Sequence, residues 1–187
     1  EQEDLQDYQM GISTIEKRSE GLINFVSDFR SLAHVPTPKF TAIKIRELFD
    51  RLDILFQNQL EEKEIKFTKE ILPNDLLLFA DCALIEQVLI NLTQNAIHAV
   101  EDTELKEIKL GAFIDDNGKI IIEVKDTGKG IEEEAMNKIF IPFFTTKQKG
   151  SGIGLSLSKQ IMRRHKGNLQ VKSKVGEGTV FKLIFNA

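Results

Sequence analysis

A seam of mainly apolar residues that stops at two prolines constrains this chain more than any other feature of its sequence. Between residues 5 and 33 these residues recur at alternating steps of three and four, the spacing that aligns side chains along one side of an α-helix. Pro36 and Pro38 end the helix, because proline cannot continue a helix and restricts the residue before it. The sequence therefore predicts a long helix over residues 1–36 and a separate domain over residues 37–187. The seam consists of Leu5, Tyr8, Ile12, Ile15, Ser19, Leu22, Val26, Phe29 and Ala33.

The flanks of this helix are polar, as in the run Glu16-Lys17-Arg18, so the helix alone would expose its seam to water. Such a helix needs partner helices, supplied either by a part of the protein outside this sequence or by a second copy of the chain. A helix bundle formed by two copies is the arrangement we expect in the intact protein.

Beyond the prolines the periodicity changes to a mixture of helices and strands. Asp81 is a plausible N-cap for a long apolar helix, and Asn117-Gly118 between two apolar runs is a strong hairpin signal. The predicted fold is of the α+β class, a two-layer α/β sandwich whose helices cover one face of a mixed, mostly antiparallel sheet. The expected helices cover residues 45–56, 82–100, 132–138 and 151–165, and the expected strands cover residues 65–71, 76–79, 108–114, 119–125, 169–175 and 180–185.

Charge and cysteine content exclude several classes of function. Lys and Arg total 25 against 29 Asp and Glu, so the net charge of -4 offers no global basic field for nucleic acid or an anionic membrane. Cys82 is the only cysteine, which excludes an internal disulfide and a cysteine-based zinc site. No apolar run approaches the ~20 residues of a membrane-spanning helix. We expect a cytoplasmic chain and leave open a membrane anchor on the intact protein.

The first cluster that could bind a ligand is Asn91 and Asn95, which share one face of the expected helix because they are four residues apart. An asparagine carbonyl oxygen is a neutral hard ligand that suits Mg²⁺, an ion that usually keeps waters and takes phosphate oxygens. The other interpretation is that both amides bridge backbone groups in the core.

The second cluster is the run from Asp126 to Ile131, directly after an apolar strand. A carboxylate at a strand end can accept a hydrogen bond from an exocyclic amine such as that of adenine. Gly128 and Gly130 would let a flat base approach the backbone, although Asp-x-Gly-x-Gly is also an ordinary turn.

Two further clusters follow along the chain. In the segment 139–147, aromatic residues surround Pro142 in a polar loop, which indicates aromatic anchors that dock reversibly. The segment ends at Lys147, a cation that can contact a phosphate. Residues 150–155 form a glycine-rich start to a helix, which presents free amides and the positive end of the helix dipole to an anion. This run matches neither the P-loop nor the dinucleotide-binding fingerprint.

Taken together and in this order, the four clusters resemble the N, G1, F and G2 boxes of the histidine kinase ATP-binding domain, which has the Bergerat-type ATP-binding fold. Residues 178–181 are similar to the final glycine box of that family, so the resemblance covers about residues 40–187. The segment 143–155 looks like the short lid of nitrogen-regulator-like sensor kinases. Residues 1–36 resemble the second helix of the dimerisation and phosphoacceptor domain, and residues 37–187 resemble the catalytic domain.

The resemblance implies ATP and Mg²⁺ as cofactors. Asp126 would bind the adenine amine with support from Thr179, Asn95 would coordinate Mg²⁺, and Lys147 would lie near the β- or γ-phosphate. His98 stands where many members carry a lysine. The residues implied in ATP binding are Asn91, Asn95, His98, Asp126, Gly128, Gly130, Ile131, Thr145, Thr146, Lys147, Gly150, Ser151, Gly152, Ile153, Gly154, Leu155 and Thr179.

Two departures from the family pattern shape the expected activity. Asn91 stands where members that hydrolyse ATP place a glutamate, and an asparagine cannot take a proton at neutral pH, which favours phosphoryl transfer over hydrolysis. None of His34, His98 and His165 has the sequence context of the acceptor histidine, so we predict no catalytic residue of that kind in this chain and no self-phosphorylation.

The sequence therefore predicts the catalytic part of a protein-histidine kinase, which donates the γ-phosphate of ATP to a histidine on an acceptor helix outside this chain. A response regulator would then receive the phosphoryl group. Two alternatives stay open: a serine kinase of the same superfamily, and a non-catalytic module that responds to ATP. We expect no nucleic-acid partner and no direct membrane contact from this chain.

Overall fold

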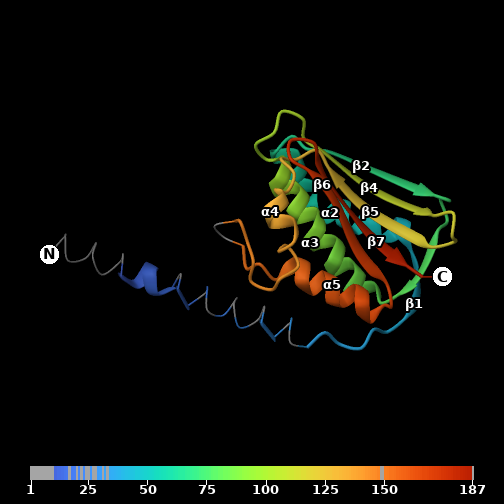
Figure 1. Ribbon diagram of the computed structural model, residues 1–187, viewed down its shortest axis with the longest axis horizontal. Helices are drawn as coiled ribbons and strands as arrows, with labels where there is room; N and C mark the ends of the chain where they lie inside the picture. Colours follow the sequence, from blue (N-terminus) through green and yellow to red (C-terminus); the bar gives the residue numbers. More distant parts are fainter. Residues whose placement is uncertain are drawn as a thin grey trace.

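The computed structural model describes residues 11–186 except residues 17, 20, 22, 24, 25, 27, 28, 31, 33, 148 and 149. The described residues between 11 and 32 are helical, and Figure 1 shows them away from the sheet and its helices. The described apolar members of the seam are all more than half exposed, as expected for a helix without a partner: Ile12, Ile15, Val26 and Phe29. Leu5, Tyr8, Leu22 and Ala33 lie outside the described residues.

A five-stranded sheet forms one layer of the domain, with the strand order β2-β4-β5-β7-β6. Strand β2 pairs with β4 in parallel, and the other neighbours are antiparallel. The hairpin predicted at Asn117-Gly118 joins β4 to β5, and Gly118 has the positive φ of 79° that this turn needs. The strands are β2 (Lys66–Leu72), β4 (Glu107–Ile114), β5 (Ile120–Asp126), β6 (Asn168–Lys174) and β7 (Gly178–Phe185).

Three helices form the second layer and cover one face of this sheet (Figure 1). They are α2 (Ile45–Glu62), α3 (Cys82–Val100) and α5 (Gly154–Arg164), with the short α4 (Glu133–Met136) between β5 and α5. A separate two-stranded sheet pairs β1 (Thr41–Lys44) with β3 (Leu77–Ala80). The predicted fold class is confirmed: the domain is a two-layer α/β sandwich with a mixed, mostly antiparallel sheet.

Two local predictions were wrong. Strand β1 was missed, because four residues with a single buried side chain carry no clear alternation. Helix α5 begins at Gly154 and not at Ser151, because Gly152 has a φ of 69° that no helix accommodates. Residues 151–153 therefore belong to the loop before the helix.

Helix α3 lies at the centre of the core, which is why it is apolar on most of its surface. Asp81 caps it as predicted, since its carboxylate accepts a hydrogen bond from Leu84 N at 3.1 Å. Six apolar side chains of the helix have no exposed surface, and each contributes ~1.5–3 kcal/mol by leaving water: Ile85, Val88, Leu89, Leu92, Ile97 and Val100.

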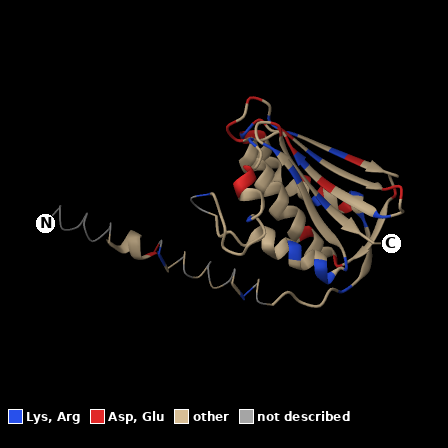
Figure 2. Ribbon diagram, viewed as in Figure 1, with Lys and Arg blue, Asp and Glu red and all other residues tan. Residues whose placement is uncertain are grey.

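The outer face of the sheet is charged, and Figure 2 shows Lys and Arg interspersed with Asp and Glu along the strands. Ion pairs join neighbouring strands, such as Lys66 to Glu107 at 2.7 Å and Lys182 to Glu123 at 3.4 Å. This face is therefore in water, whereas the other face carries the helices. Among the described residues, none of the helices has the length and apolar character needed to cross a membrane.

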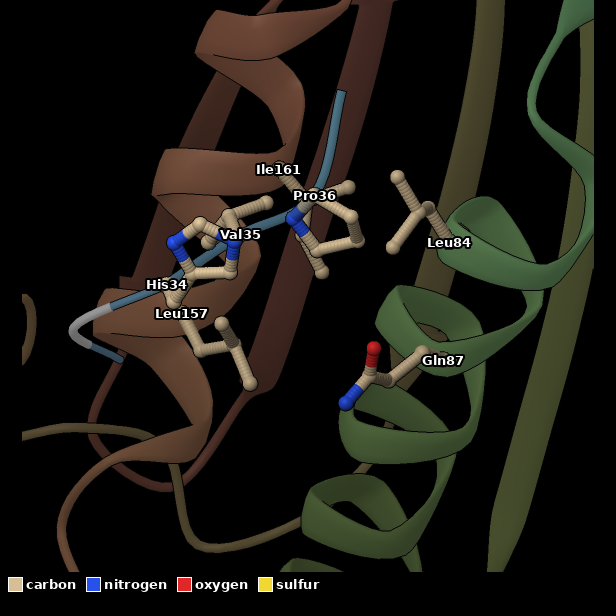
Figure 3. A pocket seen from close by; sticks show the side chains of 7 residues that line it. All are labelled: His34, Val35, Pro36, Leu84, Gln87, Leu157 and Ile161. Carbon is tan, nitrogen blue, oxygen red and sulfur yellow. The ribbon is translucent and has the colours of Figure 1, made fainter. Parts of the chain in front are cut away.

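The segment that follows the N-terminal helix lies against α3 and α5. Val35 is only 5% exposed and, with Pro36, borders a cavity of about 130 Å³ whose other walls include Leu84 of α3 and Ile161 of α5 (Figure 3). A few residues after Pro36, Lys39 N donates a 2.7 Å hydrogen bond to the Asp81 carboxylate. This segment is thus attached to the domain.

His165 closes the same region from the end of α5. Its Nδ1 donates to Ile161 O at 2.8 Å, because a carbonyl can only accept, and its Nε2 accepts from Asp81 N at 3.1 Å. His165 is therefore a buried structural histidine.

Candidate nucleotide-binding site

Asp126, the last residue of β5, is the most unusual polar group of the domain because it is a carboxylate only 3% exposed. Its Oδ1 accepts hydrogen bonds from Gly128 N at 2.8 Å and from Thr179 N at 3.2 Å. Its Oδ2 has no hydrogen-bond partner within the described part of the chain. Burial raises the pKa of Asp126 to about 6, although the two backbone donors oppose this shift. A carboxylate oxygen without a partner, on a residue that is otherwise buried, is a strong acceptor for an amine.

Thr179 supports Asp126 through its backbone, because β7 places it directly opposite Asp126 in the sheet register. Its hydroxyl instead lies 2.9 Å from Ser173 Oγ on β6. Ser173 Oγ also accepts a hydrogen bond from Ile131 N at 2.9 Å. Ser173 was missed by the sequence analysis; its only signal was its position opposite Thr179 in the closing hairpin. It ties the loop after β5 to the β6–β7 pair.

Two glycines let the loop after β5 run close to its neighbours. A Cβ on Gly128 would lie 2.6 Å from the backbone carbonyl of Ala99 in α3. A Cβ on Gly130 would lie 2.3 Å from Lys174 O, and Gly130 has a φ of 74°. Both glycines are therefore required by packing within the protein, against the end of α3 and the end of β6, and the approach of a flat base to this loop stays a prediction.

Asn91 and Asn95 lie on one face of α3 as predicted, and both are engaged with other elements. Asn91 Nδ2 donates to Ser158 Oγ of α5 at 2.9 Å, and Asn95 Nδ2 lies 3.5 Å from Asn91 Oδ1. Asn95 Oδ1 accepts a hydrogen bond from Lys147 Nζ at 2.6 Å. The two amides therefore connect α3 to α5 and to the segment before it. Ser158 carried no sequence signal, since its hydroxyl reaches Asn91 only through helix packing.

The segment between α4 and α5 folds back on itself around Phe143, which has a positive φ of 66°. Phe143 N donates to Gly152 O at 3.0 Å, and Lys147 N donates to Thr145 Oγ1 at 3.0 Å. Phe143 is 43% exposed, whereas the ring of Phe140 packs under Lys159 Nζ at 4.4 Å. The aromatic anchors of this segment are thus only partly docked.

Positive groups gather beside Asn95. Burial and the charge of Lys129 lower the pKa of Lys147, and burial together with the charge of Lys147 lowers the pKa of His98. His98 lies on α3 near Gln94 (3.5 Å). Lys147 makes no ion pair with an acidic side chain in the described ranges. Lys147 and Lys129 therefore make this part of the site positive, whereas His98 is held toward its neutral form and has the Glu101 carboxylate 3.9 Å from its Nδ1.

The two parts of the site are close because both contact α3. Gly128 packs on Ala99, which lies four residues after Asn95, or roughly 6 Å along the helix axis. The structure thus brings together the buried acceptor at Asp126, the glycine loop and the cationic cluster. Thr146 and Ser151 make no hydrogen bond to the other predicted site residues within the described part of the chain. Ile153 O accepts from Ser156 Oγ at 2.7 Å and closes the first turn of α5.

Comparisons with known proteins agree with this geometry. The family model for the histidine kinase-, DNA gyrase B- and HSP90-like ATPase matches residues 80–187. The signal transduction histidine-protein kinase AtoS of Escherichia coli (strain K12) is 31% identical over 178 residues, which are 95% of this chain and 29% of AtoS. The catalytic domain of the histidine kinase ThkA matches with a TM-score of 0.70 and 36% identity, over 79% of this chain and 95% of that domain.

A second structure of ThkA, in complex with the response regulator protein TrrA, matches with a TM-score of 0.75 and 31% identity over 91% of this chain and 48% of that chain. The Bergerat-type sandwich, the buried carboxylate and the paired asparagines together place this domain in the class of Bergerat-type ATP-binding domains. The chain belongs to the histidine kinase-, DNA gyrase B- and HSP90-like ATPase family. The chain covers 29% of the length of AtoS.

Proposed function

We propose that this chain is the ATP-binding catalytic part of a sensor histidine kinase, which donates the γ-phosphate of ATP to a histidine on a separate acceptor helix. The single observation that carries the proposal is Asp126 Oδ2, an unpartnered carboxylate oxygen on a residue 3% exposed and next to a glycine loop. An exocyclic adenine amine would supply the donor that this oxygen lacks.

The residues beside Asn95 fit a metal-bound triphosphate. Asn95 Oδ1 would hold Mg²⁺, which suits one amide oxygen because this ion takes its other ligands from phosphate and water. When bound, Mg²⁺ neutralises charge on the phosphates and makes the terminal phosphorus a better electrophile. The ammonium groups of Lys147 and Lys129 would then offset the remaining negative charge of the phosphates, and no acidic side chain pairs with Lys147 in the described residues. His98, held toward its neutral form, would contribute a hydrogen bond and not a charge.

Asn91 favours transfer to a supplied acceptor over hydrolysis. A water molecule attacking the terminal phosphate needs a base, and the amide of Asn91 cannot take a proton at neutral pH. Its Nδ2 is bonded to Ser158 and its Oδ1 faces Gly154, so the side chain is fixed in a positioning role. Catalysis would then rest on positioning and charge neutralisation.

The partners proposed for the intact protein are a second copy and a response regulator. The exposed seam of the N-terminal helix supports a dimer through a helix bundle, with residues 1–36 as the second helix of the dimerisation domain. The similarity to ThkA, solved in complex with a response regulator, supports a receiver-domain partner. The serine kinase and the non-catalytic module gain no support from any feature of the site.

A phosphotransfer assay tests this function. The chain is incubated with ATP labelled on the γ-phosphate and with a separately produced acceptor helix from a related histidine kinase. We expect acid-labile label on the acceptor histidine, little release of phosphate without the acceptor, and loss of transfer in Asp126→Asn. Acid-stable label would indicate a serine kinase, and ATP binding without any transfer would indicate the non-catalytic module.

A further inference from the structure

The hydrogen bond between Lys147 and Asn95 joins two groups that the proposed function assigns to different partners. Lys147 Nζ lies 2.6 Å from Asn95 Oδ1, the oxygen assigned to the metal ion. The bond ties the segment before α5 to α3, and the turn at Thr145, whose Oγ1 accepts from Lys147 N at 3.0 Å, holds the lysine backbone in place. An ammonium group is thus bonded to a neutral amide oxygen and not to a carboxylate.

The lysine and a metal ion would compete for this oxygen. A Mg²⁺ ion binds an oxygen at ~2.1 Å, and an ammonium nitrogen already stands 2.6 Å from the same atom. Two cations on one small atom repel each other strongly, and the more so where water is partly excluded. Binding of the metal would therefore weaken the bond between Asn95 and Lys147.

We propose that Lys147 takes the place of the metal ion at Asn95 when no metal is bound. Its ammonium group and Mg²⁺ bind Asn95 Oδ1 alternately, so that binding of the metal releases Lys147 and its segment from α3. The inference rests on the proposed function, because it requires a metal-nucleotide complex at Asn95. The released lysine then faces the phosphates that arrive with the metal. Lys147 thereby makes the position of the segment depend on the metal and not on the nucleotide alone.

Two further observations support this exchange. Lys147 has no acidic partner in the described residues, and it faces the positive Lys129, so its ammonium gains by moving to an anion. Asn95 is also the one side-chain partner of the Lys147 ammonium group among the described residues, so this single bond holds the lysine against α3.

Nitrogen-15 NMR on the 187-residue chain tests the inference with three signals. The ammonium group of Lys147 reports its bond, the side-chain amide of Asn95 reports the other partner, and the backbone amides of Gly128 and Thr179 report occupation of the Asp126 pocket. Lys147→Met removes the ammonium at similar length. Lys138→Met, on an exposed lysine outside the site, is the matched control.

Without nucleotide, we expect Lys147→Met to shift the Asn95 side-chain signal and Asn95→Ala to abolish the Lys147 ammonium signal, with no change in Lys138→Met. Saturating ADP with EDTA should shift Gly128 and Thr179 and leave Lys147 on Asn95. Addition of Mg²⁺ to the same sample should then abolish or move the Lys147 signal.

Three results would overturn the inference. They are a Lys147 signal insensitive to Asn95→Ala, a Lys147 signal that moves with ADP alone, and a Lys147 signal unchanged by Mg²⁺ while Gly128 and Thr179 report bound ADP. Failure of ADP to shift Gly128 and Thr179 under any condition would refute the proposed function, and the exchange with it. The pocket signals thus separate the two failures.

Discussion

Gly154 leaves no room for a side chain beside Asn91: a Cβ at this position would lie 2.0 Å from Asn91 Oδ1. Gly154 is the first residue of α5, and Asn91 Nδ2 also bonds to Ser158 one turn further along the same helix. The first turn of α5 therefore encloses the Asn91 amide from two sides. The glycine is needed here for space, since its φ is not in the left-handed region.

Gly154→Ala is expected to lower stability and to weaken nucleotide binding. The new methyl group must displace the Asn91 amide and break its hydrogen bond to Ser158, a loss of ~1–3 kcal/mol at a half-buried site. We expect about tenfold weaker binding of a non-hydrolysable ATP analogue by calorimetry. Gly21→Ala, where no atom lies within 4 Å of the new Cβ, is the control. Equal affinity in wild type and Gly154→Ala would show that Asn91 does not contribute to binding.

Asp126→Asn is expected to raise stability at neutral pH while it removes binding. Burial raises the folded-state pKa of Asp126 from 3.8 to about 6, so its stabilising contribution is complete below pH 3.8 and is lost as the pH rises through about 6. An asparagine keeps the acceptor for Gly128 and Thr179 without the buried charge. We expect the free energy of unfolding to increase by roughly 1–3 kcal/mol at neutral pH, measured by denaturant titration.

The same variant has a diagnostic pH dependence. Because asparagine does not titrate, the difference between Asp126→Asn and wild type should shrink as the pH falls from 7 toward 4. Asp116→Asn, an exposed turn residue, should show no such difference at either pH. A variant less stable than wild type at neutral pH would contradict the account of a costly buried charge.

Ser173→Ala tests the link between the loop after β5 and the closing hairpin. The substitution removes the acceptor of Ile131 N and the neighbour of the Thr179 hydroxyl, and an unpaired half-buried N–H costs ~1–3 kcal/mol. We expect lower stability together with faster amide hydrogen exchange at Ile131. Ser151→Ala, exposed in the loop before α5, is the control; unchanged exchange at Ile131 would refute the link.

Asp81→Ala tests the attachment of the chain entering the domain. Burial raises the pKa of the Asp81 carboxyl, but hydrogen bonds from Lys39 and Leu84 outweigh this and hold it below its ordinary value. Its stabilising contribution is therefore present above pH 3.8 and is lost as the pH falls through the lower folded-state pKa. Loss of this cap should cost ~1–2 kcal/mol near neutral pH, whereas Asp116→Ala should cost almost nothing. Limited proteolysis should also become faster at Lys39.

Much of this account was accessible from local sequence pattern. The cap at Asp81, the hairpin at Asn117-Gly118 and the strand leading to Asp126 each follow from a few neighbouring residues, and each is confirmed, although the strand includes Asp126 and does not stop at residue 125. The contacts of Ser158 and Ser173 were not accessible, because they depend on which helix or strand lies opposite. The bond between Lys147 and Asn95, which joins residues 52 positions apart, depends on the path of the loop between them.

The measurement that tests the central claim most directly is a calorimetric titration with a non-hydrolysable ATP analogue, with and without Mg²⁺, on the wild type, Asp126→Asn and Asp116→Asn. We predict that the wild type and Asp116→Asn bind, that Mg²⁺ strengthens this binding, and that Asp126→Asn does not bind while it stays folded. Absence of binding to the wild type, or binding of equal strength by Asp126→Asn, would contradict the assignment of this site to ATP.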